Sequence, residues 1–265
     1  MPYELLKAGD YARGLELFEN RHTRHTAPPR QLRFPEWRGE PLEGKTILVW
    51  GEQGLGDEIQ MVRFVRGLRE RGAATILLAC HPLNVRAFAS AGADLVFGRL
   101  GKMSLPDYDY WVGMLSLPYL FGTRPETVSG RPYIPRIAQP TGGVGLVWRG
   151  ERRNPNDSNR SMPSPALLET IPGGVFLEPE GDMLDSIARL SALDAIVTVC
   201  TSWAHLGGAV GVPTHVMLCY DADWRWGLGD RTPWYDSARL YRQKSPGDWG
   251  SVVEKVAAAL RSSAD

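Results

Sequence analysis

Hydrophobic and polar positions follow one another along this chain in a regular order. Short apolar runs such as 46–50 end at a glycine or a charged residue, and apolar residues then recur every three or four positions, as at Ile59, Val62 and Val65. The short runs predict buried strands, and the longer spacing predicts helices. Strands that alternate with helices are typical of an α/β fold with a parallel sheet.

The same alternation occurs twice. In the first half, strands are predicted at 46–50, 74–79, 93–97 and 110–114, with one helix carrying Ile59 to Leu68 and another at 83–91. A stretch rich in proline and glycine, 132–143, interrupts the pattern. In the second half, strands are predicted at 144–148, 174–177, 195–199 and 214–218, with helices at 183–193, 203–210 and 249–260. The pattern therefore predicts two Rossmann-like units in tandem.

The first 44 residues follow a different pattern. Residues 5–21 predict two short helices around Gly9, with Tyr11, Leu15 and Phe18 on one face. A polar, proline-bearing stretch, 23–43, predicts a linker on the surface. We therefore expect a helical segment and linker at 1–44, a first Rossmann-like domain at 45–137 and a second at 138–265.

Composition narrows the possible functions. Lysine plus arginine equals aspartate plus glutamate, 30 of each, and this balance argues against a general nucleic-acid binder. Three widely spaced cysteines without a CxxC motif suggest neither a disulfide framework nor a zinc ribbon. No signal segment and no apolar stretch of about 20 residues is apparent, so we expect a cytoplasmic protein without a membrane span.

The first candidate site is the glycine-rich turn after the strand at 46–50. Its glycines match neither the dinucleotide fingerprint nor a P-loop, which counts against a Rossmann dehydrogenase. Glycines allow the backbone to approach a ligand at the carboxyl end of a strand. We therefore expect Gln53, Gly54 and Gly56 in a loop at a ligand-binding cleft. Asp57 has two interpretations, a helix N-cap or a carboxylate facing the substrates, and spacing alone favours the cap.

The second candidate site is the turn at Thr201 and Ser202, between a predicted strand and a predicted helix. Hydroxyls, backbone N–H groups and the helix dipole make such a corner suitable for phosphate, although either residue also fits a simple N-cap. His205 by itself is more typical of a structural histidine. Small residues predict close packing of the helix on the sheet: Ala204, Gly207, Gly208 and Ala209.

A polar loop and the tryptophans complete the candidates. Arg149 and Arg160 bound a loop after a strand, where guanidinium groups suit phosphate, although a solvated charged loop is the simpler interpretation. Aromatic faces suit sugar rings or a nucleobase, but core packing is the commoner use of the nine tryptophans. We expect no metal, because the sequence has neither a zinc-ligand spacing nor a plain DxD motif, only Asp221-Ala-Asp223.

Six segments together resemble one known family. They are Glu52–Asp57, Gly145–Trp148, Thr201–Pro213, Asp223–Trp226, Pro233–Tyr235 and Gly247–Trp249. The chain is similar to the bacterial glycosyltransferase-like domain found behind tetratricopeptide repeats, which is related to the ADP-heptose:lipopolysaccharide heptosyltransferases. The resemblance implies a GT-B fold, two Rossmann-like domains facing across a cleft, with the acceptor on the first and the nucleotide-sugar on the second. It also makes the N-terminal helices a remnant of a tetratricopeptide repeat.

The resemblance assigns roles to the candidates. Asp57 matches the general base of the heptosyltransferases, Arg160 lies near their cation for the donor phosphates, and Thr201 and Ser202 match their phosphate-binding turn. Apart from the resemblance, the aromatic rings make Trp203 and Trp224 candidate stacking surfaces for a sugar or base. The expected donor-binding residues are Arg149, Arg160, Cys200, Thr201, Ser202 and His205. Two positions depart from the family: Cys200 occupies the place of an aspartate that contacts the donor sugar, and Trp203 replaces what is usually a smaller aliphatic residue.

These expectations combine into one function and one alternative. We expect an inverting, metal-independent glycosyltransferase that needs no cofactor beyond its nucleoside-diphosphate sugar. Its acceptor is a hydroxyl of a glycan, a lipid-linked sugar or a protein. The alternative, suggested by Cys200, is a non-catalytic module that binds a sugar nucleotide or another protein.

Overall fold

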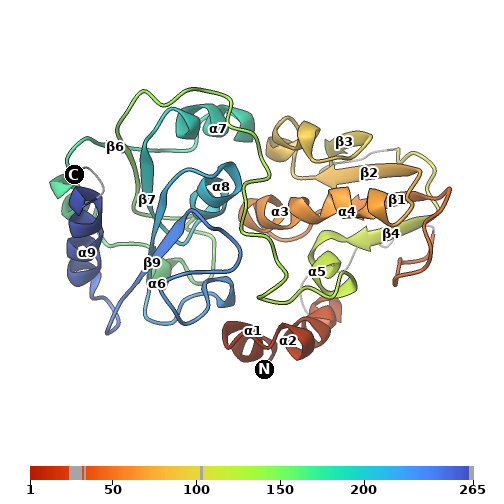
Figure 1. The fold of residues 1–265 in the computed structure, drawn as a ribbon, viewed down its shortest axis with the longest axis horizontal. Helices are drawn as coiled ribbons and strands as arrows, with labels where there is room; N and C mark the ends of the chain where they lie inside the picture. The colour runs from red at the N-terminus through yellow and green to blue at the C-terminus, as the bar shows by residue number, and fades with distance from the viewer. Residues whose placement is uncertain (24–31, 33, 102–103, 263–265) are drawn as a thin grey trace. The chain divides into compact units, whose positions relative to one another are not determined.

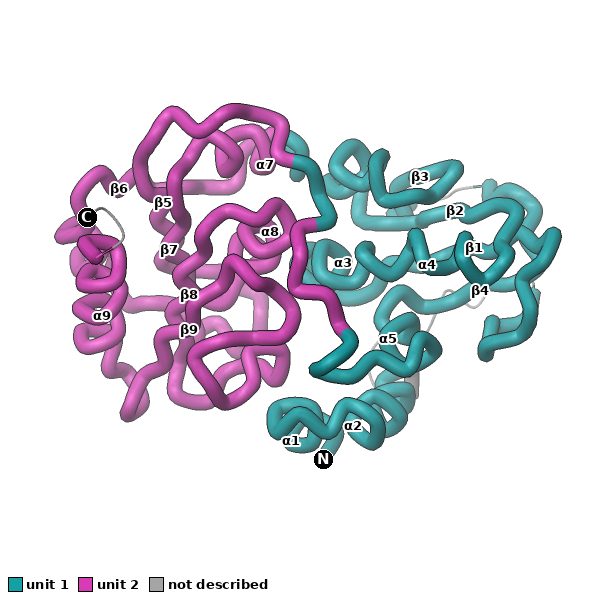
Figure 2. The backbone as a smooth tube through the Cα atoms, viewed as in Figure 1, with its two compact units in different colours: residues 1–127, 133–135, 181–184 teal, residues 128–132, 136–180, 185–265 magenta. Residues whose placement is uncertain are grey.

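The computed structural model describes residues 1–23, 32, 34–101 and 104–262. The chain forms two compact units (Figures 1 and 2). Unit 1 contains residues 1–127, 133–135 and 181–184, and unit 2 contains residues 128–132, 136–180 and 185–265. Each unit has its own parallel sheet, so the predicted α/β fold with two parallel sheets is confirmed.

The sheet of unit 1 has four parallel strands in the order β3-β2-β1-β4. Its strands are β1 (Thr46–Trp50), β2 (Thr75–Cys80), β3 (Leu95–Gly98) and β4 (Tyr110–Gly113). The inner strands β1 and β2 are almost wholly buried, because side chains on both faces of a parallel sheet are covered. The glycine-rich turn after β1 therefore leaves the middle of the sheet at its carboxyl edge.

The predicted helix after β1 is present, although its backbone changes type along its length. It consists of α3 (Leu55–Met61), a 3-10 turn η2 (Val62–Phe64) and α4 (Val65–Glu70), and its apolar side chains are buried as the spacing predicted. The predicted helix at 83–91 is wrong. Two 3-10 turns, η3 (Pro82–Asn84) and η4 (Ala87–Ser90), occupy this stretch, because i→i+3 bonding gives nearly the same apolar spacing.

The N-terminal segment belongs to unit 1. The two predicted helices are α1 (Pro2–Lys7) and α2 (Tyr11–Phe18), followed by η1 (Glu19–Thr23), and the face formed by Tyr11, Leu15 and Phe18 is buried. Helix α2 packs near α5 (Leu117–Leu120), which follows η5 (Met114–Ser116). The origin of this segment in a tetratricopeptide repeat stays a prediction.

The predicted surface linker, 23–43, lies partly outside the described residues, and its described end contradicts a simple surface path. Trp37 and Leu42 are fully buried. The backbone N–H of Trp37 donates to the carbonyl of Trp111 at 2.7 Å, which extends the edge of the sheet beside β4. The large apolar side chain of Trp37 explains the difference, since its burial stabilises the contact with the sheet.

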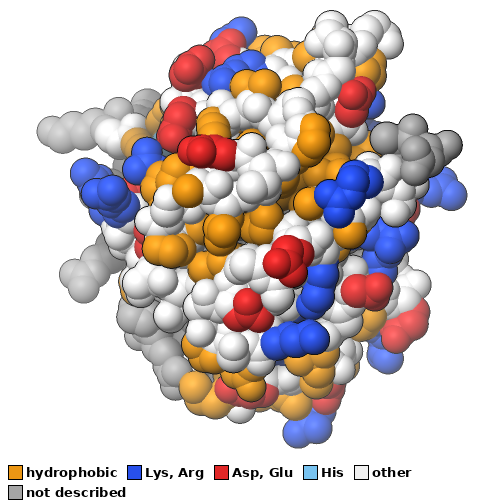
Figure 3. All heavy atoms as spheres, turned by 90° about the vertical axis from the view of Figure 1, so that its left-hand side faces the viewer, with side chains coloured by type: hydrophobic (Ala, Val, Ile, Leu, Met, Phe, Trp, Pro, Cys, Tyr) orange, Lys and Arg blue, Asp and Glu red, His pale blue; other side chains and the backbone are white. Residues whose placement is uncertain are grey.

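Unit 2 has five parallel strands in the order β6-β5-β7-β8-β9. Its strands are β5 (Val144–Val147), β6 (Gly174–Phe176), β7 (Ala195–Val199), β8 (Thr214–Leu218) and β9 (Ala238–Arg242). The sequence pattern missed β9, because this edge strand alternates apolar and charged residues and lacks a continuous apolar run. The opposite edge strand, β6, is exposed, and Figure 3 shows apolar side chains among charged ones on the side of the molecule that carries β6 and α9.

The predicted helices of the second half are present as α7 (Met183–Ser191), α8 (Ser202–Val210) and α9 (Trp249–Ser262), and the first two residues of α7 belong to unit 1. A 3-10 turn, η6 (Ala166–Thr170), precedes β6, and the sequence pattern missed two short elements, α6 (Asp157–Arg160) and η7 (Trp224–Trp226). The predicted close packing of α8 is confirmed. A Cβ atom at Gly207 would overlap the hydroxyl of Thr214 on β8, and one at Gly208 would overlap the ring of Tyr235.

Candidate functional site

The turn after β1 places Asp57 in the first turn of α3. The helix begins after Gly54, so Asp57 is its third residue and not its N-cap, which corrects the predicted position. Its capping function is nevertheless confirmed, because Oδ2 accepts a hydrogen bond from the backbone N–H of Gly54 at 2.9 Å. This bond fixes the carboxylate at the positive end of the helix dipole. The side chain is half-buried.

A buried carboxylate next to Asp57 anchors the turn to β2. Glu58 is fully buried and accepts hydrogen bonds of 2.8 Å from the backbone N–H of His81, from Nδ2 of Asn84 and from Nε of Arg99. Gly51 provides the necessary room, since a Cβ atom there would overlap the carboxylate of Glu58. The glycine at the end of β1 therefore serves the internal support of the turn.

A second buried carboxylate anchors the turn to the N-terminal segment. Glu52 forms a two-pronged ion pair with Arg21, from Nη2 to Oε2 at 2.8 Å and from Nε to Oε1 at 3.2 Å. Both side chains are 5% exposed. Burial alone lowers the pKa of Arg21, but the charges and hydrogen bonds of Glu52 and Glu19 outweigh it and raise the pKa above its ordinary value. Arg21 therefore keeps its charge although it is buried.

Gln53 is the strained residue of this turn. Its φ of 56° lies in the left-handed region, which a residue other than glycine enters at a cost of about 1 kcal/mol or more. Arg99 holds it there, because Nη2 donates to the carbonyl oxygen of Gln53 at 3.1 Å while Nε bonds Glu58. A strained backbone held by buried partners is a common feature of functional turns.

In unit 2, the turn after β7 leads into α8 through Thr201. Thr201 is the N-cap of α8, with Oγ1 accepting from the backbone N–H of Trp203 at 3.3 Å and lying 3.2 Å from Oγ1 of Thr198. The predicted cap is thus confirmed. Thr201 is buried and its hydroxyl already contacts Thr198 and the N–H of Trp203, whereas Ser202 is half-buried. A phosphate at this turn would therefore meet Ser202 and backbone N–H groups.

Arg160 reaches the same turn from a loop 40 residues earlier in the chain. Its Nη1 donates to the carbonyl oxygen of Cys200 at 3.2 Å, and Nε lies 3.3 Å from Oδ1 of Asp157. The structure thus brings Arg160, Cys200 and Thr201 together, and donor binding by these residues stays a prediction. Arg149 points elsewhere: its guanidinium lies over the ring of Trp148 and 3.5 Å from Glu178.

Cys200 provides a neutral thiol at this turn. Nε1 of Trp226 donates to Sγ at 3.0 Å. Burial, together with the negative charge of Asp223, raises the pKa of the thiol to about 12. Burial would also raise the pKa of Asp223, but the charge and hydrogen bonds of Arg225 hold it below its ordinary value. The thiol is therefore protonated near neutral pH and is neither a nucleophile nor an anion.

The predicted aromatic and histidine ligands are packed inside unit 2. His205 is buried, with Nδ1 2.9 Å from the hydroxyl of Tyr235 and its ring stacked on Trp226. Trp203 and Trp224 are also buried, and the ring of Trp224 meets that of Trp234 edge to face. These contacts are structural, and a role in binding donor or sugar stays a prediction for all three.

The sequence interpretation missed the residues that support the first turn. Arg21, Glu52, Glu58 and Arg99 were not assigned roles, because isolated charges resemble ordinary surface residues until their partners are known. Glu52 and Glu58 flank the glycines of the turn, but acidic residues are common at the start of a helix, so their positions carried no distinct signal.

Clusters of metal ligands and membrane-spanning helices are both absent from the described part of the chain. Within residues 1–23, 32, 34–101 and 104–262, no group of three or more His, Cys, Asp or Glu side chains is arranged to hold a metal ion. In the same residues, no helix has the length and apolar character needed to cross a membrane. The expectation that function needs no metal stays a prediction.

Comparisons with known proteins relate the chain to glycosyltransferases through its fold. No protein-family model matches the sequence. Protein FlbA of Caulobacter vibrioides is 26% identical over 97% of this chain and 53% of its own length, so the chain spans about half of that curated relative.

Three solved structures are similar, each at 12% identity. The iron-containing dodecameric glycosyltransferase TibC of enterotoxigenic E. coli has a TM-score of 0.58, over 85% of this chain and 78% of its own. A family 9 glycosyl transferase of Veillonella parvula has a TM-score of 0.56, over 85% and 99%. The E. coli ADP-heptose lipopolysaccharide heptosyltransferase II has a TM-score of 0.53, over 82% and 98%. The chain thus has the α/β fold, with parallel sheets, of these glycosyltransferases.

Proposed function

We propose that this chain is a cytoplasmic glycosyltransferase of GT-B type that inverts the anomeric carbon. It moves a sugar from a nucleoside-diphosphate donor to a hydroxyl of a glycan, a lipid-linked sugar or a protein. The observation that carries the proposal is the fold, which matches three glycosyltransferases over 82% or more of this chain. The chemistry of the two turns supports it.

Asp57 is the proposed general base. An acceptor hydroxyl becomes an adequate nucleophile when a carboxylate removes its proton, and such a base contributes typically 10²–10⁴-fold to the rate. The hydrogen bond from Gly54 fixes the carboxylate, and the buried ion pairs of Glu52 and Glu58 fix the turn that carries it. A carboxylate held this firmly loses little freedom when substrate binds.

The turn at Thr201 is the proposed site of the donor diphosphate. The acceptor oxygen forms a bond to the anomeric carbon, the bond from that carbon to the diphosphate oxygen breaks, and Asp57 takes the hydroxyl proton. The leaving diphosphate gains negative charge, which Arg160, Ser202 and the positive end of α8 stabilise. This arrangement supplies cationic stabilisation from the chain itself, so we propose transfer without a metal.

The test is transfer or hydrolysis of a panel of nucleoside-diphosphate sugars, with and without a chelator. We expect Asp57→Asn to lower kcat by at least about 100-fold while donor affinity is unchanged. The control is Asp10→Asn, which changes another aspartate that accepts a backbone N–H at the start of a helix: Asp10 is the N-cap of α2, with Oδ1 3.2 Å from the N–H of Arg13. Turnover of no donor would contradict sugar transfer. Full activity in Asp57→Asn would contradict the role of Asp57 as the base, and complete loss of activity with the chelator would contradict transfer without a metal.

A second function, binding of a sugar nucleotide without turnover, is favoured by Cys200. The neutral thiol occupies a position where the resembling family carries an acid, and Asp223 is the nearby ionised carboxylate. Calorimetry would then show binding of nucleoside diphosphates, with no product from any donor. The variant Cys200→Asp separates a decayed enzyme, in which transfer appears, from a dedicated binding module, in which it does not.

A further inference from the structure

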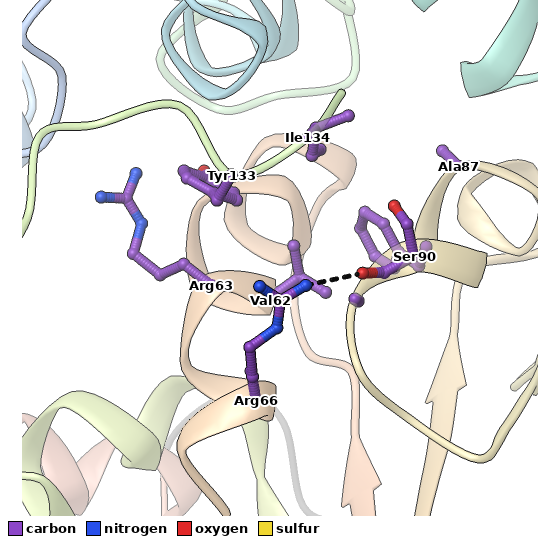
Figure 4. A pocket seen from close by; sticks show the side chains of 9 residues that line it. Val62, Arg63, Arg66, Ala87, Ser90, Tyr133 and Ile134 are labelled. Atoms are coloured by element: carbon purple, nitrogen blue, oxygen red, sulfur yellow. Dashed lines mark hydrogen bonds between the residues drawn. The ribbon is translucent and has the colours of Figure 1, made fainter. Parts of the chain in front are cut away.

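Unit 1 contains a pocket away from the turn that carries Asp57. It lies between the helix formed by η2 and α4, the 3-10 turn η4, and the segment 133–134 (Figure 4). The pocket has a volume of about 70 Å³. Its wall is formed mainly by Val62, Arg63, Arg66, Phe88, Tyr133 and Ile134.

The volume restricts the occupant to one small group. A water molecule takes about 30 Å³ in the liquid, so this space holds about two waters or a single tetrahedral or planar oxyanion. Pockets for whole drug-sized ligands are several times larger, on the order of 300 Å³ and above. The pocket therefore suits one functional group, with the remainder of a ligand outside it.

Two guanidinium groups give the pocket its charge. Arg63 and Arg66 are three residues apart, so both side chains lie on one face of the helix. Nη2 of Arg66 donates to the carbonyl oxygen of Ser90 at 3.2 Å, and no carboxylate among the described residues pairs with Arg66. By contrast, Arg69 on the same helix is paired with Asp94. No acidic side chain lines the pocket.

The guanidinium of Arg63 is held before any ligand arrives. It lies 4.2 Å from the centroid of the Tyr133 ring, and its Nε donates to the carbonyl of Gln60 at 2.9 Å. Tyr133 is itself fixed, because its hydroxyl donates to the carbonyl of Ile59 at 2.8 Å. A cation held by an aromatic face and a hydrogen bond loses less side-chain entropy on binding.

We propose that this pocket binds one oxyanion group, a phosphate or a carboxylate, of a small organic ligand. Arg66 supplies hydrogen bonds from the open side of the pocket and Arg63 supplies positive charge beside Tyr133. The apolar wall of Val62, Phe88 and Ile134 contacts the carbon skeleton next to the anion. The proposal is independent of sugar transfer, because it concerns binding within unit 1 alone.

The test is titration of the intact protein with inorganic phosphate, glucose 1-phosphate and acetate, followed by NMR shifts of the methyl groups of Ala87, Ala91 and Ile134. We expect saturable shifts, and a loss of affinity of at least tenfold in Arg66→Gln, because a charge-assisted hydrogen bond is among the strong ones. Ala91→Leu fills the pocket without changing charge and is expected to abolish the shifts. Tighter binding of the sugar phosphate than of phosphate identifies an organic phosphate as the ligand class, and saturation by acetate alone identifies a carboxylate.

Two controls separate this pocket from other anion sites. Arg69→Gln removes a cation of the same helix that does not line the pocket, and Arg160→Gln disables the proposed donor site in unit 2. Both variants are expected to keep the affinity of the unchanged protein. The proposal would be overturned if no anion gave saturable shifts, or if both Arg66→Gln and Ala91→Leu kept the affinity of the unchanged protein. It would also be overturned if either control lost as much anion affinity as Arg66→Gln.

Discussion

The two strand-to-helix turns, after β1 in unit 1 and after β7 in unit 2, have the same topology and opposite chemistry. Ion pairs hold the first turn, through Glu52 with Arg21 and Glu58 with Arg99. The second has no buried ion pair of this kind: it is held by the hydroxyl of Thr201, the thiol of Cys200 and a hydrogen bond from Arg160 to the carbonyl oxygen of Cys200. The first presents a fixed carboxylate, as a base requires, and the second presents N–H groups beside Arg160, as an anion requires. In the proposed reaction, the same topology would serve the base in one turn and the leaving diphosphate in the other.

The difference also concerns how each turn resists change. A buried ion pair adds modestly to stability, but losing one partner leaves an uncompensated charge and is strongly destabilising. A neutral cap loses only about 1 kcal/mol when its hydroxyl is removed. We therefore expect a single substitution to cost more stability in the first turn than in the second.

The largest expected effect comes from breaking the ion pair of unit 1. Arg21→Met leaves Glu52 buried without its cation, so we expect the free energy of unfolding to fall by about 3 to 5 kcal/mol in urea titration. The control Arg13→Met removes an exposed cation that lies 3.4 Å from Asp10, and we expect a change below about 1 kcal/mol. Similar losses in the two variants would show that the first turn does not depend on buried charge.

A somewhat smaller effect is expected in unit 2 on acidification. Burial, with the charge of Arg239 as a second cause, lowers the pKa of His215 to about 4, and its Nδ1 lies 2.9 Å from the hydroxyl of Tyr241. The unfolded chain takes up a proton near pH 6.5, before the folded chain does. The stabilising contribution is therefore complete above pH 6.5 and lost as pH falls toward 4, by about 3 kcal/mol.

Hydrogen exchange measures this effect in each unit separately. Amides of β8 should lose protection between pH 6.5 and 4 by more than those of β1, after correction for the intrinsic exchange rate. In His215→Gln, which has no titrating ring, the additional loss in β8 is expected to disappear. An identical pH dependence in the variant would mean that another group controls the acid response of unit 2.

The smallest expected effect concerns the backbone strain at Gln53. Gln53→Val places a β-branched residue at a φ of 56°, so we expect a loss of about 1 to 2 kcal/mol, whereas Gln53→Gly changes stability by less than about 1 kcal/mol. The corresponding turn of unit 2 already tolerates a β-branched residue, because Thr201 has an extended φ of −138°. Equal stability of the two Gln53 variants would show that backbone strain at position 53 does not distinguish the two turns.

The sequence predicted most of the fold, and its errors share a cause. The runs at 46–50, 195–199 and 214–218 coincide with β1, β7 and β8, because buried parallel strands read as continuous apolar runs. The stretch at 83–91 was misread because 3-10 turns have nearly the apolar spacing of a helix, and β9 was missed because its alternation covers only five residues. Local pattern alone could not separate these cases.

The candidate site was predictable in part. Thr201 was expected to be an N-cap from its place between strand and helix, and it is one. Asp57 was also expected to be an N-cap, but it is the third residue of its helix and caps from there. The family resemblance placed Arg160 near the donor phosphates, but its bond to the carbonyl oxygen of Cys200 was not predicted, because 40 residues separate the two. The burial of Trp203 and Trp224 was left open, since tryptophan serves both cores and ligand sites.

The sequence by itself determined the order and type of the elements and the two turns where chemistry is expected. These features depend on local periodicity and on glycine or capping residues, which act over a few neighbouring positions. Only the tertiary structure decided which charges are buried and with whom: Glu52 with Arg21, and Glu58 with Arg99. Such partners lie far apart in sequence, and the cost of removing a charge from water is met only when folding brings them together.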